Sequence, residues 1–191
     1  MGLTKPIELN LLSYQGTFMY LRNIIRGDFK MNSLAEFKLR NAEEKDIPVI
    51  YELIQELAVY EKMEDKLIAT KEILKESLFS KKAAEIAIAE CNGLPAGYAM
   101  YFYNFSSFIG KPGLYLEDIY IRPQYRGRGY GKSILSYLAE LAVKKDCWGM
   151  EWTCLDWNEP SIRFYESIGA VHHEGWRIYR LKGEALVNLS K

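Results

Sequence analysis

Cysteine is scarce in this chain of 191 residues, which holds only three: Cys91, Cys147 and Cys154. Their number is odd and no two of them form a Cys-x-x-Cys pair, which argues against a disulfide framework and against a zinc site. Free thiols are typical of a reducing compartment, so we expect the protein in the cytoplasm.

Net charge and long apolar runs are missing as well. Lysine plus arginine and aspartate plus glutamate both count 25, so the formal net charge is +0. The chain thus has no global field of one sign that would recruit nucleic acid or an anionic membrane. No apolar run has the length of a membrane-spanning helix, and the N-terminal residues lack the apolar core of a signal peptide. We therefore expect neither a nucleic-acid partner nor a membrane partner.

One domain is enough to account for the chain. Hydrophobic residues make up 49% of it, which allows a chain of this size to bury a core in a single unit. Residues 1–34 precede the first expected strand and carry none of the motifs described below. We expect an N-terminal extension of unknown role over residues 1–34 and one domain over residues 35–191.

Several short segments of the chain predict β-strands, because apolar and polar residues alternate in them between turn residues. Asn92-Gly93 stands between two such segments and predicts a tight hairpin turn. The strand that precedes the glycine-rich stretch is expected at the centre of the sheet. The expected strands cover residues 36–40, 85–90, 97–103, 114–121, 150–155 and 176–182.

Helices are expected between these strands. Asp46 and Thr70 can each cap a helix, and a third helix is expected over residues 131–145. The order of elements fits an α/β fold with a mixed sheet. The apolar faces of the first and third helices consist of Ile47, Ile50, Ile54, Leu57, Ala58, Ile134, Leu135, Leu138, Leu141 and Ala142.

The most informative stretch is LYLEDIYIRPQYRGRGYG, residues 114–131, in which an apolar strand leads through a glycine-rich turn into a helix. Gly127, Gly129 and Gly131 let the backbone curl with its N–H groups turned inward. The helix N-terminus adds free donors and the positive end of a dipole, so the turn suits a pyrophosphate. A P-loop would need glycine in place of Arg126, and the glycine spacing departs from the dinucleotide fingerprint. A plain surface turn is the remaining alternative.

A second stretch, TCLDWNEPSIRFYESIGA over residues 153–170, joins an expected strand to a short helix. Asn158 can cap this helix, Pro160 can start it and Gly169 can end it. With both stretches in view, the chain resembles the GNAT acetyltransferase superfamily and, within it, the spermidine/spermine family of diamine and polyamine acetyltransferases. The matching patches are Arg126-x-x-Gly129-x-Gly131, Trp157-Asn158-Glu159-Pro160-Ser161 with Phe164-Tyr165, Tyr60-Glu61-x-Met63-Glu64, Leu116-Glu117-Asp118 and Glu174-Gly175-Trp176.

The resemblance covers roughly residues 37–186 and implies a fold and an activity. The implied fold is the GNAT acyltransferase fold, an α/β fold whose mixed central β-sheet has a splayed strand pair and flanking helices. The implied activity is direct transfer of acetyl from acetyl-CoA to a primary amine of a small diamine or polyamine, such as spermidine or spermine, in a ternary complex. It further implies a homodimer with active sites near the subunit boundary, and no metal.

The resemblance also implies which residues form the site. Tyr165 would be the general acid for the leaving thiolate, and Glu117 would handle the amine proton. Alternation along the strand sends the Glu117 and Asp118 side chains to opposite faces, so at most one of them would point into the site, and the resemblance selects Glu117. The implied substrate contacts are Tyr60, Glu61, Glu117, Trp152 and Glu174. The implied contacts to acetyl-CoA are Ile119, Tyr120, Ile121, Arg126, Gly127, Arg128, Gly129, Tyr130, Gly131, Lys132, Asn158, Ser161 and Tyr165.

Other interpretations stay open at the level of sequence. The amine could be thialysine or another lysine-like amino acid, whose carboxylate would want a basic contact such as Arg163 or Arg177. The chain could also be an acyl-CoA-binding module without catalysis. His172-His173 is a poor metal site, because neighbouring residues on a strand point oppositely and no third ligand has suitable spacing. Cys154 could form an acyl-enzyme, but a buried cysteine is usually a small hydrophobe and direct transfer is preferred.

Overall fold

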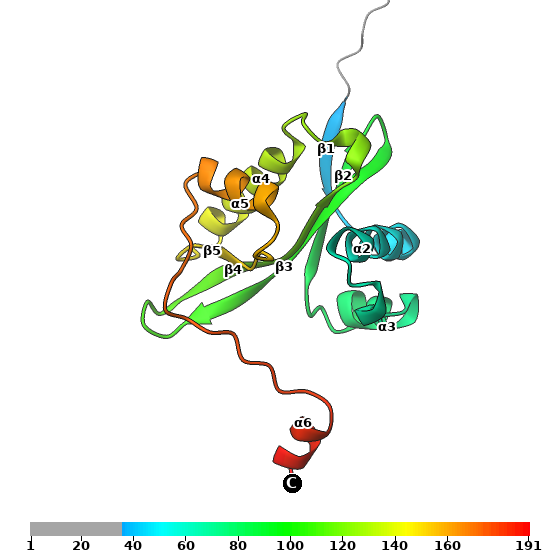
Figure 1. Ribbon diagram of the computed structural model, residues 1–191. Coiled ribbons are helices and arrows are strands. Elements are labelled where there is room, and N and C mark those ends of the chain that lie inside the picture. The colour runs from blue at the N-terminus through cyan, green and yellow to red at the C-terminus, as the bar shows by residue number, and fades with distance from the viewer. Residues whose placement is uncertain (1–35) are drawn as a thin grey trace, which may run out of the picture. The chain divides into compact units, whose positions relative to one another are not determined.

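The computed structural model in Figure 1 describes residues 36–191. The expected extension over residues 1–34 lies outside this range. The chain divides into two compact units with a boundary between Glu151 and Trp152, and each unit is described by itself. Among the described residues, no helix combines the length and the apolar character needed to cross a membrane.

Five strands form one sheet in the order β1-β2-β3-β4-β5, and each neighbouring pair from β1 to β4 is antiparallel. The α/β fold class is thereby confirmed. The prediction that residues 114–121 form the central strand is wrong, because β3 is the middle strand and β4 has only the short β5 beyond it. The strands are β1 (Phe37–Asn41), β2 (Glu85–Cys91), β3 (Leu94–Ser106), β4 (Lys111–Ile121) and β5 (Met150–Trp152).

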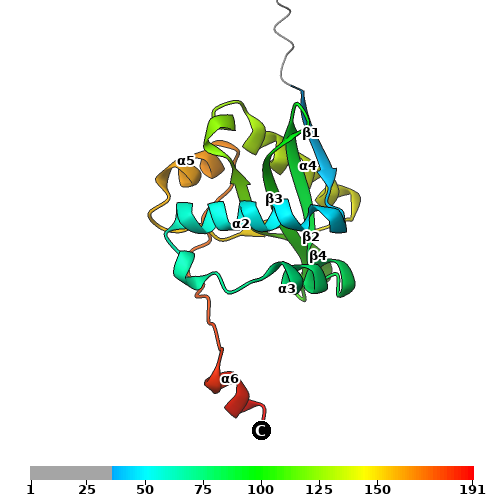
Figure 2. The same ribbon diagram turned by 90° about the vertical axis from the view of Figure 1, so that its right-hand side faces the viewer.

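Helices cover both faces of the sheet within the first unit. In Figure 1, α2 and α3 lie on one face and α4 lies on the opposite face, and Figure 2 shows α2 running across the strands. The helices are α2 (Ile47–Glu61), α3 (Lys71–Lys75), α4 (Tyr130–Lys144), α5 (Glu159–Ser167) and α6 (Glu184–Leu189), with short helical turns η1 (Glu44–Asp46), η2 (Glu64–Lys66), η3 (Glu76–Ser80) and η4 (Pro123–Tyr125).

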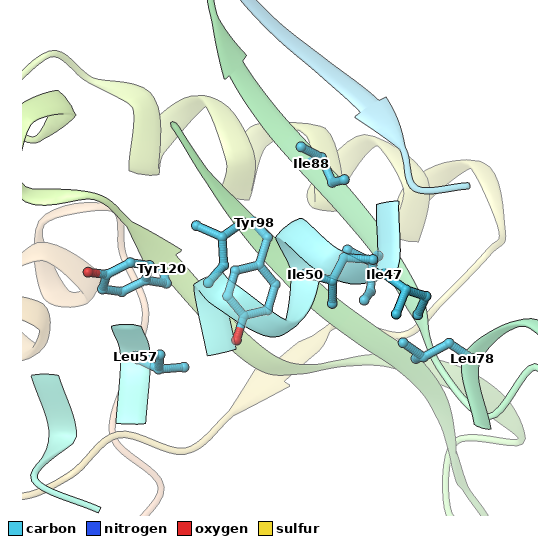
Figure 3. Packing of buried hydrophobic residues seen from close by; sticks show 9 residues of the cluster. Ile47, Ile50, Leu57, Leu78, Ile88, Tyr98 and Tyr120 are labelled. Carbon is cyan, nitrogen blue, oxygen red and sulfur yellow. The ribbon is translucent and has the colours of Figure 1, made fainter. Parts of the chain in front are cut away.

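A continuous core fixes α2 against the sheet. The apolar stripe of α2 packs on Ile88 and Tyr98, and the cluster extends to Tyr120 near the end of β4 (Figure 3). Burying each large apolar side chain contributes about 1.5–3 kcal/mol. The last turn of α2, which carries Tyr60 and Glu61, is therefore held beside the end of β4. The buried members are Ile47, Ile50, Leu53, Leu57, Leu78, Ile86, Ile88, Tyr98 and Tyr120.

Several local predictions are confirmed. Asn92 and Gly93 adopt positive φ of 52° and 75° in the turn between β2 and β3, as the predicted hairpin requires. The Thr70 hydroxyl accepts a hydrogen bond from the Ile73 N–H at 3.3 Å and so caps α3. On the opposite face of the sheet, α4 buries four of its five expected apolar residues, and Leu141 stays partly exposed.

Two helix caps differ from the prediction. Asp46 and Asn158 precede α2 and α5, but neither side chain caps the helix that follows it. The Asp46 carboxylate instead accepts hydrogen bonds from the Arg40 guanidinium at 2.6 Å and 2.9 Å. It also accepts from the Glu43 N–H at 2.8 Å, in a capping box at the start of η1. Arg40 and Glu43 thus engage the carboxylate in place of the first N–H groups of α2.

The strand predicted over residues 176–182 is wrong, and the strand predicted over residues 150–155 ends at Trp152. Residues 170–182 run without regular structure to α6. Trp176 and Tyr179 are 77% and 85% exposed in this segment. A β-strand needs a neighbour for its backbone N–H and C=O groups, and alternation of apolar residues alone does not supply one.

The close approach of β3 to β4 at Gly97 leads to a first prediction. A Cβ atom at Gly97 would lie 2.1 Å from the Tyr120 carbonyl oxygen, so Gly97→Ala must push the two strands apart. We expect a loss of about 1–3 kcal/mol in the free energy of unfolding, measured by urea denaturation. Gly149→Ala is the matched control, because no atom lies within 4 Å of its Cβ position. Equal stability of the two variants would contradict this account.

Candidate functional site

A β-bulge near the end of β4 organises the first half of the site. Met100 pairs with Asp118 and Tyr101 pairs with Leu116, so Glu117 is an extra residue without a partner on β3. A bulge bends its strand and re-aims side chains. The strict alternation that would send Glu117 and Asp118 to opposite faces therefore fails at this position.

Three carboxylates, Glu61, Glu117 and Asp118, lie near one another around this bulge, and we call them the acidic cluster. Glu117 is exposed, whereas Asp118 is partly buried and accepts a hydrogen bond from the Tyr98 hydroxyl at 3.0 Å. Burial raises the pKa of Asp118 to about 6; the Tyr98 hydroxyl opposes this, and Glu117 and Glu61 add to it. Burial also raises the pKa of Glu61. The cluster can attract an ammonium group, and one of its members can hold a proton near neutral pH.

The last turn of α2 adds aromatic surface beside the acidic cluster. The ring centroids of Tyr60 and Tyr120 are 6.5 Å apart. The guanidinium of Arg126 lies 4.7 Å from the Tyr60 ring centroid and 5.5 Å from that of Tyr120. The structure thus brings the expected substrate residues Tyr60 and Glu61 together with the first residue of the glycine-rich turn.

The glycine-rich turn itself has the geometry expected of an anion cradle. Gly127 and Gly129 adopt φ of 73° and 82°, a backbone conformation that other residues rarely take. Arg126 ties the turn to the strand before it, because its Nε donates to the Ile121 carbonyl at 2.8 Å. The N-terminus of α4 follows at Tyr130 and supplies free N–H groups and the positive end of its dipole. The turn therefore fits a pyrophosphate.

Individual residues of the predicted turn differ in their surroundings. The Tyr130 side chain is buried and stacks on Phe37 with ring centroids 4.1 Å apart, so only its backbone is available to a ligand. Gly131 lies inside α4 rather than in the turn. Lys132 lines an open groove along α4, whose walls are Gly129, Lys132, Ser133, Ser136, Tyr137 and Glu140.

Sequence reasoning missed the anchor at the end of β4. Arg122 donates to both carboxylate oxygens of Glu56 at 2.7–3.1 Å and to the Pro95 carbonyl at 3.1 Å. It also pairs with Glu52 of the same helix. These bonds fix the point where the chain leaves the sheet for the turn. No sequence motif marks Arg122, since its partners lie far away along the chain.

The second unit carries the remaining expected site residues. The Trp152 and Tyr165 rings are in contact, with centroids 5.1 Å apart. Asn158 is buried, and its carbonyl accepts from the N–H groups of Ser161 and Ile162 at 3.0 Å, which starts α5. Glu174 is exposed in the irregular segment after α5. The unit thus holds Trp152, Asn158, Ser161 and Tyr165 around one short helix, and their roles stay predictions.

The residues that match a known family include the turn and the acidic cluster. Residues 47–170 match the model of the acetyltransferase (GNAT) family. The chain belongs to this family. The GNAT resemblance seen in the sequence is confirmed, and the protein is an acetyltransferase of the kind that uses acetyl-CoA.

Curated relatives of this GNAT chain act on several amines. The thialysine N-epsilon-acetyltransferase of Bos taurus is 35% identical over 169 residues, which is 82% of this chain and 99% of the relative. The L-ornithine N5-acetyltransferase of Arabidopsis thaliana is 30% identical and covers 81% of this chain and 88% of the relative. The human spermidine/spermine N(1)-acetyltransferase-like protein 1 is 34% identical over 84% of this chain but only 25% of the relative.

Solved structures share the GNAT fold at low identity. An integron cassette protein of V. cholerae aligns with a TM-score of 0.69 and 23% identity, over 81% of this chain and 98% of that one. An aminoglycoside N-acetyltransferase in complex with CoA aligns with a TM-score of 0.64 and 18% identity, over 80% and 99%. These likenesses confirm the fold.

The glycine-rich turn generates a second prediction. Gly129→Ala forces a φ of 82° on a residue with a Cβ, at a strain of about 1–3 kcal/mol, so the turn must change shape. We expect acetyl-CoA binding to weaken at least tenfold, measured as Kd by calorimetry. Gly93→Ala is the matched control, because it imposes similar strain at φ 75° in a hairpin outside the turn. This variant should keep the original Kd. If both variants kept the original Kd, the turn would not hold acetyl-CoA.

Proposed function

We propose that this chain transfers acetyl from acetyl-CoA to the distal primary amine of thialysine or a similar amino acid. The observation that carries the proposal is the acidic cluster at the β4 bulge, next to a turn that fits a pyrophosphate. The relatives support an amino acid as substrate, since two of them are named for thialysine and L-ornithine. Polyamines are the second candidate, because a spermidine/spermine-like relative is 34% identical.

The residues of the first unit would bind and deprotonate the amine, and they would hold acetyl-CoA. A primary amine of this kind has a pKa of about 10.4, so it arrives as an ammonium ion that the acidic cluster attracts. Glu117 would take its proton, because it is the exposed carboxylate of the cluster. The turn from Arg126 to Lys132 would hold the pyrophosphate, and backbone groups of Ile119, Tyr120 and Ile121 would hold the pantetheine arm.

Acetyl-CoA supplies the activated acetyl group, and its thiolate needs a proton on departure. Tyr165 is the proposed donor, because its hydroxyl is suited to this step. Trp152 fixes one side of the Tyr165 ring through the contact at 5.1 Å. Asn158 and Ser161 belong to the same helix start and are proposed to contact acetyl-CoA. The metal-free mechanism, the cytoplasmic location and the absence of nucleic-acid and membrane partners remain predictions.

A panel of amines tests the proposed substrate. Acetyl-CoA consumption by the full chain is measured with thialysine, ornithine, lysine, spermidine, spermine and putrescine. We expect kcat/KM to be highest for thialysine or ornithine, because relatives that align over most of both chains carry these names. A higher value for the polyamines would select the second candidate. Tight acetyl-CoA binding without turnover of any amine would favour the non-catalytic module.

We also propose a homodimer, in which the segment after α5 finds its neighbour in a second copy. Trp176, Ile178 and Tyr179 are 70–85% exposed there, and a segment of alternating apolar residues is typical of strand exchange between copies. This segment carries Glu174, so exchange would bring a substrate residue from one copy toward the site of the other.

Molecular mass in solution tests the homodimer. Light scattering should give about twice the chain mass of 22.1 kDa. Ile178→Asp should shift the protein to the monomer, since a charge opposes burial of this position. Ile68→Asp is the control, because Ile68 is 87% exposed outside the segment. A monomeric unaltered chain would refute the proposal.

A further inference from the structure

Within the acidic cluster, Asp118 is the carboxylate that the Tyr98 hydroxyl binds, and the mechanism described so far gives neither residue a role of its own. Tyr98 stands on β3, is fully buried, and belongs to the core beneath α2 (Figure 3). Its hydroxyl donates to Asp118 Oδ2 at 3.0 Å. Asp118 is the residue directly after the bulge and pairs with Met100 across the ladder. The hydroxyl therefore fixes a carboxylate at the point where β4 changes direction.

Burial makes this hydrogen bond a permanent one. Burial of the Tyr98 hydroxyl raises its pKa, and the negative charge of the neighbouring Asp118 raises it further. The hydroxyl therefore keeps its proton, and remains a donor, at any working pH. The titratable groups that face Asp118 are Glu61 of α2, Tyr98 of β3 and Glu117 of β4 itself. These neighbours are two carboxylates and a hydroxyl, so the surroundings of Asp118 call for a cationic ligand rather than an anionic one.

We propose that Asp118, held by the Tyr98 hydroxyl behind Glu61 and Glu117, is a positioning residue whose negative charge is required for the ammonium form of the amine to bind. Exposed Glu117 is screened by water, whereas a partly buried charge acts through a lower dielectric and reaches further. Asp118 thus contributes attraction that the exposed carboxylate lacks. This inference rests on the proposed acetyl transfer to an amine.

The pH dependence of amine binding follows from this placement. Asp118 is ionised above its pKa of about 6 and neutral below it. The attraction for ammonium is therefore present at pH 8 and lost as the pH falls through about 6. Since the Tyr98 hydroxyl lowers the pKa of Asp118, removal of that hydroxyl moves the loss to higher pH.

Two variants with opposite effects test the inference. In Asp118→Asn the negative charge is missing at every pH. KM for the amine should therefore rise about tenfold at pH 8, which is the factor that corresponds to a change of one pKa unit. In the unaltered chain kcat/KM should fall as the pH drops through about 6, and this fall, the acid limb of the pH profile, should disappear in Asp118→Asn. In Tyr98→Phe the charge remains, so kcat/KM at pH 8 should stay close to its original value while the acid limb moves to higher pH. The Kd of acetyl-CoA should change in neither variant.

Tyr101→Phe is the matched control. The Tyr101 hydroxyl is also buried on β3 and donates to a carboxylate, Glu85 Oε2, at 3.2 Å. Its electrostatic neighbours include Tyr137 of α4, on the other side of the sheet. Thermal unfolding of Tyr101→Phe and Tyr98→Phe should show similar losses of stability, but the acid limb should move only in Tyr98→Phe.

The outcomes separate this inference from the proposed function. Turnover of any amine by the unaltered chain supports acetyl transfer. An acid limb that persists in Asp118→Asn, or that fails to move in Tyr98→Phe, overturns the role of Asp118 and leaves acetyl transfer intact. If no amine is turned over, the inference is tested by calorimetry of thialysine and spermidine binding at pH 8 and pH 5. Tighter binding at pH 8 is expected. Equal affinity at both values, or no binding at either, would overturn it.

Discussion

The pairing of β3 with β4, and the single extra residue within it, is the constraint on which the site depends. The two strands pair from Gly97 with Ile121 to Ser106 with Lys111, interrupted only at Glu117. Backbone hydrogen bonds on both sides of the bulge hold it in place, because a one-residue slip of the pairing register would turn every side chain of the slipped segment to the other face. The bulge therefore gives a fixed position to Glu117 and Asp118, and the remaining strand delivers Ile121 to the glycine-rich turn.

The position of α2 keeps the arginines near the end of β4 apart from the acidic cluster. Arg122 binds Glu52 and Glu56 near the middle of the helix, which neutralises those carboxylates away from the acidic cluster. Arg126 lies over the Tyr60 and Tyr120 rings, where it gains a cation–π contact without neutralising the cluster. The end of the sheet thus carries a turn whose geometry suits an anion and, separate from it, a cluster of carboxylates.

Local signals in the sequence predicted the parts of the fold that depend on neighbouring residues. Asn92-Gly93 predicted its hairpin and Thr70 its cap, since both act within four residues. The turn around Gly129 was predicted for the same reason. The bulge and the Tyr98 hydrogen bond depend on what lies opposite, as does the lack of a strand over residues 176–182. A single chain read in order does not contain that information. Alternation alone therefore could not place the side chains of Glu117 and Asp118.

Charge also bears on which amine of an amino acid would react. Two unit charges 4 Å apart interact with about 4 kcal/mol at an effective dielectric constant of about 20, and the attraction or repulsion falls as they separate. The α-amine of thialysine or ornithine lies beside its own carboxylate, so presenting it to Glu61, Glu117 and Asp118 would bring a fourth negative charge into the acidic cluster. The distal amine is separated from that carboxylate by a flexible chain and enters without it. An acidic cluster at the bulge therefore favours the distal amine over the α-amine before any specific contact to the far end of the substrate is made.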